Sequence, residues 1–322
     1  MRFEPLYQYR LWGSRNLANL LSEPLPGDGP IGEAWLLSDR DDFNNIVANG
    51  HLKGQSLGQL LKNWPEQMLG KLSRRFKKFP LLLKFLDVHD FLSVQVHPSD
   101  SHPEFLSAGE TGKTEAWVVL EATSESRIYA GLKPESSADD IRAASNNGTI
   151  VEKLEYFTPK SGDGVFIPAG TVHALGGDVV VFEVKQNSDV TFRLYDWNHV
   201  DTKTGKRRTL QVEQAIASIN FTPDAVGLVV PVVEQAKPAL RERLFLCEHF
   251  GLWRFRGENP FTVGEAEIPR ILVCLSGNGQ LVNDGVNYFV GKGDVWLLPA
   301  ETGTCVFQPG SEVNILEISL PE

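Results

Sequence analysis

The sequence predicts a mainly β protein made of two related β-barrels and a few short helices. Many short runs rich in Val, Ile, Phe and Trp are separated by Gly, Asn, Asp and Pro, which is typical of sandwiches and barrels. Helical periodicity is scarce, and one strand-and-turn pattern occurs twice. With 322 residues, the chain has room for roughly two domains.

The strand prediction depends on six runs of apolar residues that begin or end at turn residues. In chain order these are AWVVLEA, GDGVFIPAG, VVVFEVKQNS, VTFRLYDW, RILVCLSGNGQLV and GDVWLLPA.

Three segments carry helical signals, and three to five short helices are expected in total. The first has apolar residues at i, i+3, i+4 and i+7, namely Leu57, Leu60, Leu61 and Trp64. The second has Ser137 three residues before Asp140, the spacing of a capping box, and the third begins at Thr209 as its expected N-cap.

The repeated pattern is a Gly-Asp turn, an apolar strand and a Pro-Ala pair, beginning once at Gly162 and once at Gly293. Five residues after the proline, the first copy has His173 and the second has Thr304, so only the first copy keeps a metal-binding side chain. The expected domains are residues 1–225, with inserted helices at about 55–75 and 136–156, and residues 240–322, joined by a linker around 220–240.

Charge and composition exclude several classes of protein. The formal net charge is −10, from 31 basic and 41 acidic residues, which opposes binding to nucleic acid or to an anionic membrane. The first 21 residues lack the apolar region of a signal peptide, and no apolar run is long enough to span a membrane, so a cytoplasmic protein is expected. Three widely spaced cysteines, Cys247, Cys274 and Cys305, are expected to be buried, reduced thiols rather than disulfides or a thiolate metal site.

Several of the predicted strands contain polar residues whose side chains point to the same face of the strand. In FLSVQVHPSD, Ser93, Gln95 and His97 alternate with valines and share one face. Charged side chains in apolar strands are costly to bury unless they are paired or bind a metal. Gln95, His97, Glu115 and His173 would together form a nitrogen and oxygen ligand set for zinc or another divalent ion, although spacing alone does not show that they converge.

Two motifs resemble known families. GDGVFIPAGTVH is similar to the second cupin motif, with Gly162, Pro168, Gly170 and His173 at its spacing, but Gly177 stands where that motif usually ends in Asn. The segments PIGEAWLLS, PLLLKFLDVHDFLSVQVHPSD, TGKTEAWVVL, IPAGTVHALGG and VTFRLYDW occur in the order seen in type I mannose-6-phosphate isomerases. The chain resembles the short bacterial form of that family, strongly over residues 5–220 and less in its C-terminal third.

This resemblance implies two cupin-type (jelly-roll) barrels and an enzyme that interconverts mannose 6-phosphate and fructose 6-phosphate through a cis-enediol. It implies one catalytic zinc per chain and, as partner, a phosphorylated hexose, in a monomer or small homo-oligomer. The residues that it assigns are zinc ligands (Gln95, His97, Glu115 and His173), catalytic residues (Arg193, Lys113 and Glu183) and substrate-binding residues (Ser93 and Lys84). Lys113 or Glu183 would move the proton.

Alternatives remain open at this point. A non-catalytic sugar-binding cupin and an iron-dependent cupin dioxygenase share the expected fold. Lys84 could extend from the barrel edge to solvent, and the basic loop with Lys206, Arg207 and Arg208 could bind phosphate or form a solvated turn. In the C-terminal barrel, Cys274, Trp296 and Cys305 occupy the expected site region without metal ligands, so that barrel is expected to support the first.

Overall fold

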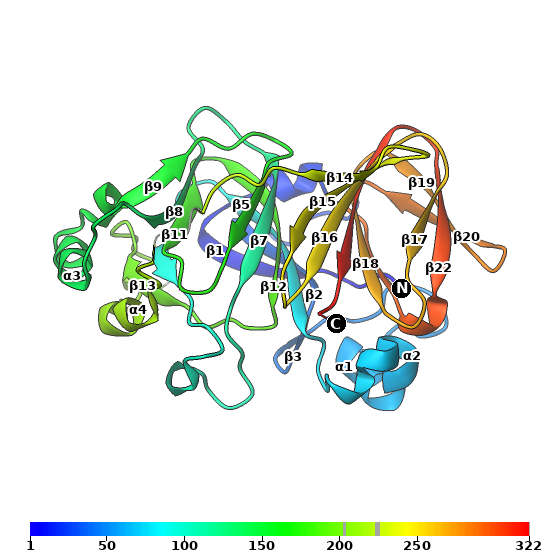
Figure 1. The fold of residues 1–322 in the computed structure, drawn as a ribbon, viewed down its shortest axis with the longest axis horizontal. Coiled ribbons are helices and arrows are strands. Elements are labelled where there is room, and N and C mark those ends of the chain that lie inside the picture. Colours follow the sequence, from blue (N-terminus) through cyan, green and yellow to red (C-terminus); the bar gives the residue numbers. More distant parts are fainter. Residues whose placement is uncertain (202–203, 223–225, 322) are drawn as a thin grey trace.

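The computed structural model describes residues 1–201, 204–222 and 226–321 and has two β-barrels side by side (Figure 1). The predicted mainly β fold is confirmed. Each barrel combines a six-stranded sheet with a smaller one. In the first barrel the six-stranded sheet has the order β1 (Leu6–Ser14), β2 (Ile31–Leu37), β5 (Leu81–Val88), β12 (Val179–Gln186), β7 (Glu115–Glu121) and β10 (Gly164–Ile167). The five-stranded sheet has the order β13 (Phe192–Tyr195), β6 (Val94–Val96), β11 (His173–Gly176), β8 (Arg127–Leu132) and β9 (Leu154–Phe157).

The second barrel follows the same plan. Its six-stranded sheet has the order β14 (Val232–Gln235), β15 (Leu240–Leu246), β16 (Gly251–Gly257), β23 (Val313–Ser319), β18 (Arg270–Ser276) and β21 (Val295–Leu298). Its four-stranded sheet has the order β17 (Phe261–Gly264), β22 (Thr304–Pro309), β19 (Asn278–Asn283) and β20 (Val286–Gly291). A separate two-stranded ribbon pairs β3 (Asp39–Arg40) with β4 (Phe43–Asn44).

The predicted repeat corresponds to β10 and β21, which both end their six-stranded sheets. Gly162 and Gly293, which begin the two copies, have φ values of 91° and 84°, in the left-handed region that favours glycine. We retain the predicted domain boundaries at 225 and 240 as a proposal; residues 223–225, within the predicted linker, lie outside the described residues.

Among the described residues there are four α-helices, as predicted: α1 (Leu57–Asn63), α2 (Pro65–Leu69), α3 (Ala138–Asn147) and α4 (Val212–Ser218). Short 3-10 turns occur at η1 (Asn16–Asn19), η2 (Gly70–Arg74), η3 (Pro103–Phe105), η4 (Ile150–Lys153) and η5 (Ala300–Thr302). The capping box of Ser137 and Asp140 is confirmed. Trp64 is not part of the buried stripe, because it lies at the junction of α1 and α2 and is 37% exposed.

The prediction that a helix begins with Thr209 as its cap is wrong. Helix α4 begins at Val212 after Gln211, which makes no side-chain cap. Gln211 instead accepts a hydrogen bond from the Arg193 N–H through its side chain and donates its own N–H to the Arg193 carbonyl. These hydrogen bonds hold the segment before α4 against β13, so the helix begins at Val212 rather than directly after Thr209.

The two barrels share one continuous cluster of buried apolar residues. Phe166 on β10 contacts Phe245 and Phe250 of the second barrel, with ring centroids 6.0 and 6.4 Å apart. Helices α1 and α2 come from the first quarter of the chain, yet they lie beneath the second barrel (Figure 1). Gly70 makes this contact possible, because a Cβ there would lie 2.0 Å from the Glu267 carbonyl oxygen.

The three cysteines are free, as predicted, and Cys274 and Cys305 are buried in the second barrel. The prediction of burial is wrong for Cys247, which is half-buried. Within the described ranges, no helix has both the length and the apolar character needed to cross a membrane.

Candidate active site

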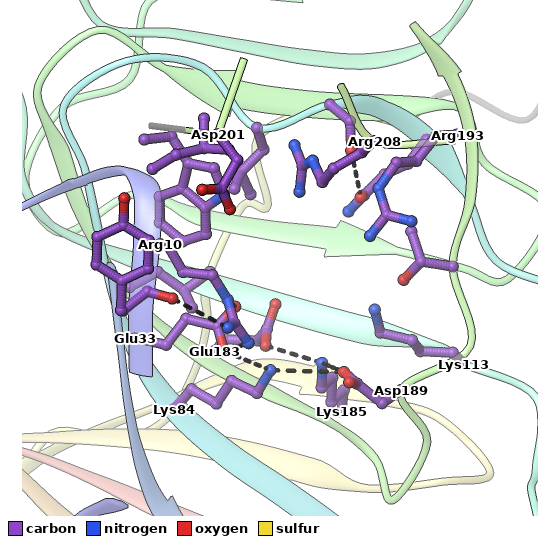
Figure 2. Close-up of a pocket in the computed structure, with 18 residues that line it drawn as sticks. Arg10, Glu33, Lys84, Lys113, Glu183, Lys185, Asp189, Arg193, Asp201 and Arg208 are labelled. Carbon is purple, nitrogen blue, oxygen red and sulfur yellow. Dashed lines mark hydrogen bonds and ion pairs between the residues drawn. The ribbon is translucent and has the colours of Figure 1, made fainter. Parts of the chain in front are cut away.

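A cavity of about 360 Å³ opens into the first barrel, and charged side chains dominate its wall (Figure 2). Six cations face four anions: Arg10, Lys84, Lys113, Lys185, Arg193 and Arg208 against Glu33, Glu183, Asp189 and Asp201. This local excess of positive charge in a protein of net charge −10 fits an anionic ligand. Every residue predicted to be catalytic or substrate-binding lines this cavity.

His97, Glu115 and His173 form a buried cluster beside this cavity. One potential ligand atom from each lies within 4.8 Å of the others. The Glu115 carboxylate bridges the two rings, with Oε2 3.5 Å from His97 Nε2 and Oε1 3.3 Å from His173 Nε2. Three strand ends create the cluster, because His97 follows β6 while Glu115 and His173 begin β7 and β11.

Gln95 joins the same cluster through strand pairing. It lies directly opposite His173 in the β6–β11 register, and its Nε2 is 3.2 Å from His173 Nε2. Ser93 donates a hydrogen bond of 3.1 Å to Gln95 Oε1. The structure therefore brings all four predicted metal ligands together, although β6 proper covers only residues 94–96.

The electrostatics of the cluster fit a divalent metal ion. Burial lowers the pKa of His97 and of His173, so both imidazoles are neutral and have a lone pair to share. Among the described residues, no hydrogen-bond partner reaches the buried Oε2 atom of Glu115. The ammonium of Lys113 lies 2.9 Å from His97 Nε2 and 3.5 Å from Glu115 Oε2, so these ligand atoms already attract positive charge.

Lys113 itself is buried, with 4% of its surface exposed. Burial, assisted by the nearby charge of Lys185, lowers the pKa of Lys113 to about 8. A lysine with this pKa exchanges a proton near neutral pH, which an ordinary lysine does not.

Lys84 is buried and paired, so the alternative that it extends to solvent is wrong. Its Nζ lies 3.1 Å from Glu33 Oε2, 3.7 Å from Asp189 Oδ1 and 4.3 Å from the centre of the Trp35 ring. Figure 2 shows Lys84, Glu33 and Asp189 together at one side of the cavity.

Glu33, Lys185 and Asp189 also line the cavity, and none of them was predicted as a site residue. Lys185 lies 3.3 Å from Glu183 Oε2 and 3.7 Å from Asp189 Oδ1, and only 2% of it is exposed. Two signals were present: Lys185 shares a strand face with Glu183, two residues away, and Glu33 interrupts the apolar run IGEAWLL.

Arg193 and Arg208 lie at the opposite side of the cavity (Figure 2). The Arg208 guanidinium binds both carboxylate oxygens of Asp196, with Nε 2.8 Å from Oδ2. Burial first, and then the charge of Arg208, lowers the pKa of Arg193. The residues of the basic loop therefore differ in their surroundings: Lys206 and Arg207 are exposed, whereas Arg208 lines the cavity. Residues 202–203 of that loop lie outside the described residues.

Fold and site together define a two-barrel cupin with a candidate metal centre beside a charged cavity. Residues 1–126 match the family model described as phosphomannose isomerase type I, catalytic domain. Two Bacillus subtilis (strain 168) proteins are similar over 94% of this chain: "Probable mannose-6-phosphate isomerase GmuF", 31% identical over 96% of its length, and "Mannose-6-phosphate isomerase ManA", 32% identical over 93%. The solved mannose 6-phosphate isomerase of Bacillus subtilis superposes with a TM-score of 0.90 and 27% identity over 99% of both chains. The chain belongs to the mannose-6-phosphate isomerase family, a family of aldose-ketose isomerases.

Proposed function

We propose that this protein interconverts mannose 6-phosphate and fructose 6-phosphate with the help of one zinc ion. The observation that carries the proposal is the buried His97, Glu115 and His173 cluster beside a cavity with an excess of cations. The names of GmuF and ManA supply the substrate.

His97, Glu115 and His173 would hold the ion with two imidazole nitrogens and a carboxylate, a donor set suited to zinc. The Gln95 amide, which already contacts His173, would supply its oxygen as a fourth ligand. When bound, zinc supplies a Lewis acid that stabilises negative charge on the oxygen atoms of the substrate.

The reaction removes a proton from C2 of the aldose and returns it at C1 through a cis-enediol. Lys113 is our candidate for the group that moves this proton, because its lowered pKa of about 8 leaves a neutral fraction near neutral pH. Glu183 stays ionised: burial opposes its charge, but Lys185, Lys84 and Lys113 together hold its pKa below the ordinary value. Glu183 would therefore accept hydrogen bonds from the sugar and orient it. Arg193 would stabilise the oxyanion that develops along the reaction.

The phosphate group would bind between Arg193 and Arg208. Arg208 keeps one edge of its guanidinium on Asp196, while Arg193 has a buried Nε without a hydrogen-bond partner in the described part of the chain. Arginine is well suited to phosphate because its planar group presents several donors at once. Lys84, on the other side, and Ser93, which hydrogen-bonds to Gln95, would contact sugar hydroxyls.

One observation favours a second candidate. Two histidines and one carboxylate are also the ligand set of non-haem iron oxygenases. The metal must therefore be varied in the test.

The test is a coupled assay of fructose 6-phosphate formation with zinc-loaded, chelated, zinc-restored and iron-loaded protein. We expect activity to disappear with the chelator, return with zinc and be absent in His173→Ala, while His51→Ala, a change at an exposed histidine, keeps it. A protein that binds zinc but does not convert mannose 6-phosphate in any of these states would contradict the proposal. Oxygen consumption by the iron-loaded form would support the oxygenase instead.

A further inference from the structure

The second barrel has a cavity of its own, of about 330 Å³. Arg241, Phe255, Arg270 and Glu317 line it, one each from β15, β16, β18 and β23. Their order in the sheet is β15, β16, β23 and β18. The corresponding strands of the first barrel have the order β2, β5, β12 and β7. The expected site residues of this barrel, Cys274, Trp296 and Cys305, belong instead to its apolar core.

Strand register identifies which residues of the two barrels correspond. Glu115 pairs with Ile167, the last residue of β10, and Arg270 pairs with Leu298, the last residue of β21. Because β10 and β21 are the two copies of the repeat, Arg270 occupies the position of Glu115.

The same comparison relates the carboxylates of the two barrels. Glu115 pairs with Lys185 on β12, and Arg270 pairs with Ser319 on β23. Two residues earlier on these strands are Glu183 and Glu317. Glu317 therefore occupies the position of Glu183, and both face a cavity.

A third pair of positions is related through the next strand. Glu33 pairs with Leu86, and Arg241 pairs with Phe255. Leu86 in turn pairs with Val181, and Phe255 pairs with Ile315. Val181 and Ile315 each lie two residues before the matching carboxylates, Glu183 and Glu317. Arg241 therefore occupies the position of Glu33.

The second cavity thus has guanidiniums at two positions where the first barrel has the carboxylates Glu33 and Glu115. It keeps one carboxylate, Glu317, and a further one, Glu265, also lines it. Arg270 lies 3.6 Å from Glu265, and Arg241 lies 3.7 Å from Glu234. By contrast, Arg254, which does not line this cavity, lies 2.9 Å from Glu242.

Arg241 also has a buried Nε for which the described residues provide no hydrogen-bond partner. A buried donor without a partner is costly, so a ligand acceptor would stabilise it. Phe255 forms an aromatic wall of the cavity. Its ring stacks on Phe261 with centroids 5.0 Å apart, and the Arg241 guanidinium lies over the same ring.

We propose that this cavity binds a small organic anion through its carboxylate or phosphate group, held between Arg241 and Arg270. The apolar part of the ligand packs against Phe255. Glu317, which accepts a 2.7 Å hydrogen bond from the Gly264 N–H, and Glu265 limit the negative charge that the cavity accepts.

The test is isothermal titration of the full-length, zinc-loaded protein with inorganic phosphate and, separately, with succinate. For at least one probe, we expect Arg270→Gln and Arg241→Gln each to weaken one binding event by about tenfold or more, as expected for the loss of a charge-assisted hydrogen bond. The probe that responds identifies the group that the cavity recognises. Glu317→Gln should tighten the same event, because it removes a negative charge.

The matched control is Arg243→Gln, since Arg243 lies on the same strand and contacts the same Glu234 but does not line the cavity. It should bind both probes as the unchanged protein does, and all variants should keep their isomerase kinetics. The proposal is wrong if neither probe binds at tens of millimolar, or if both cavity variants bind as Arg243→Gln does.

Discussion

Lys185 is the buried centre of the charged network, so its replacement by methionine tests how that network works. Methionine keeps much of the side-chain length but removes the charge that faces Glu183 at 3.3 Å and Asp189 at 3.7 Å. Trp117, which donates a 3.2 Å hydrogen bond to Glu183 Oε1, would remain in place. The substitution therefore leaves a buried carboxylate that has lost its nearest cation.

The expected loss is large. At 3.3 Å and an effective dielectric constant of about 20, the attraction between two unit charges is about 5 kcal/mol. Removing one partner of a buried pair costs about 3–5 kcal/mol, because the other charge stays desolvated. Lys84 and Lys113 still act on Glu183, so we expect the free energy of unfolding to fall by about 3 kcal/mol.

The pH dependence of this loss has a definite sign. Burial raises the pKa of Glu183, but Lys185 and two other cations hold it below its usual 4.5, so its ionisation stabilises the fold above that pH. That contribution is lost as the pH falls through the lowered pKa of the folded state. Without Lys185 the pKa rises, so the loss should be larger at pH 7 than near pH 4.

The assay is urea unfolding at both pH values, with coupled isomerase kinetics on the same samples. Lys78→Met is the control: Lys78 makes a shorter ion pair, 2.8 Å from Asp41, but both are exposed, so a much smaller loss is expected. In the double variant Glu183→Gln/Lys185→Met, the loss should be smaller than in Lys185→Met alone. Equal losses in Lys185→Met and Lys78→Met at pH 7, or a loss in Lys185→Met that is the same at both pH values, would refute the reasoning.

Three further predictions follow from single positions. Arg208→Gln should raise the KM for mannose 6-phosphate about tenfold with little change in kcat, whereas the exposed Arg207→Gln should leave both unchanged in steady-state kinetics. Lys113→Met should lower kcat by about a hundredfold or more, and a variant that keeps most of its turnover would exclude this residue as the proton carrier. Gly70→Ala should lower the unfolding free energy by about 2 kcal/mol or more, because the new Cβ would lie 2.0 Å from a carbonyl oxygen at a φ of +56°; Gly54→Ala, at a φ of +91° in open space, measures the strain alone.

The sequence predicted the fold well where local chemistry decides it. The turn glycines Gly162 and Gly293 and the capping box at Ser137 act through their own backbone conformation or near neighbours, so a short motif is sufficient. The start of α4 was missed because Gln211 bonds to β13, which lies 18 residues earlier in the chain. A contact of that kind has no local signature.

The same distinction explains which site residues were found. His97, Glu115 and His173 lie in motifs to which the family resemblance assigns a role, whereas Lys185 lies outside those segments and Glu33, within PIGEAWLLS, was assigned none. Each of these two is an ordinary charged residue until the fold places an opposite charge beside it. Alternation along a strand gives the face of a residue, but it does not give the neighbouring strand, and the neighbouring strand decides whether a buried charge is paired.

The second barrel shows why the absence of metal ligands did not reveal what its cavity contains. The repeat predicted that Thr304 replaces His173, but the correspondence of Arg270 with Glu115 appears only when the register of β18 with β21 is known. The apolar residues that build both barrels follow the same alternation, so a change of sign at a few inward positions leaves the scaffold intact. Carboxylates at these positions, such as Glu33 and Glu115, attract cationic groups, whereas guanidiniums at the same positions, such as Arg241 and Arg270, attract an anionic group. A barrel of this plan that has lost its metal ligands is therefore still equipped to bind, and its guanidiniums favour an anionic group over a metal ion.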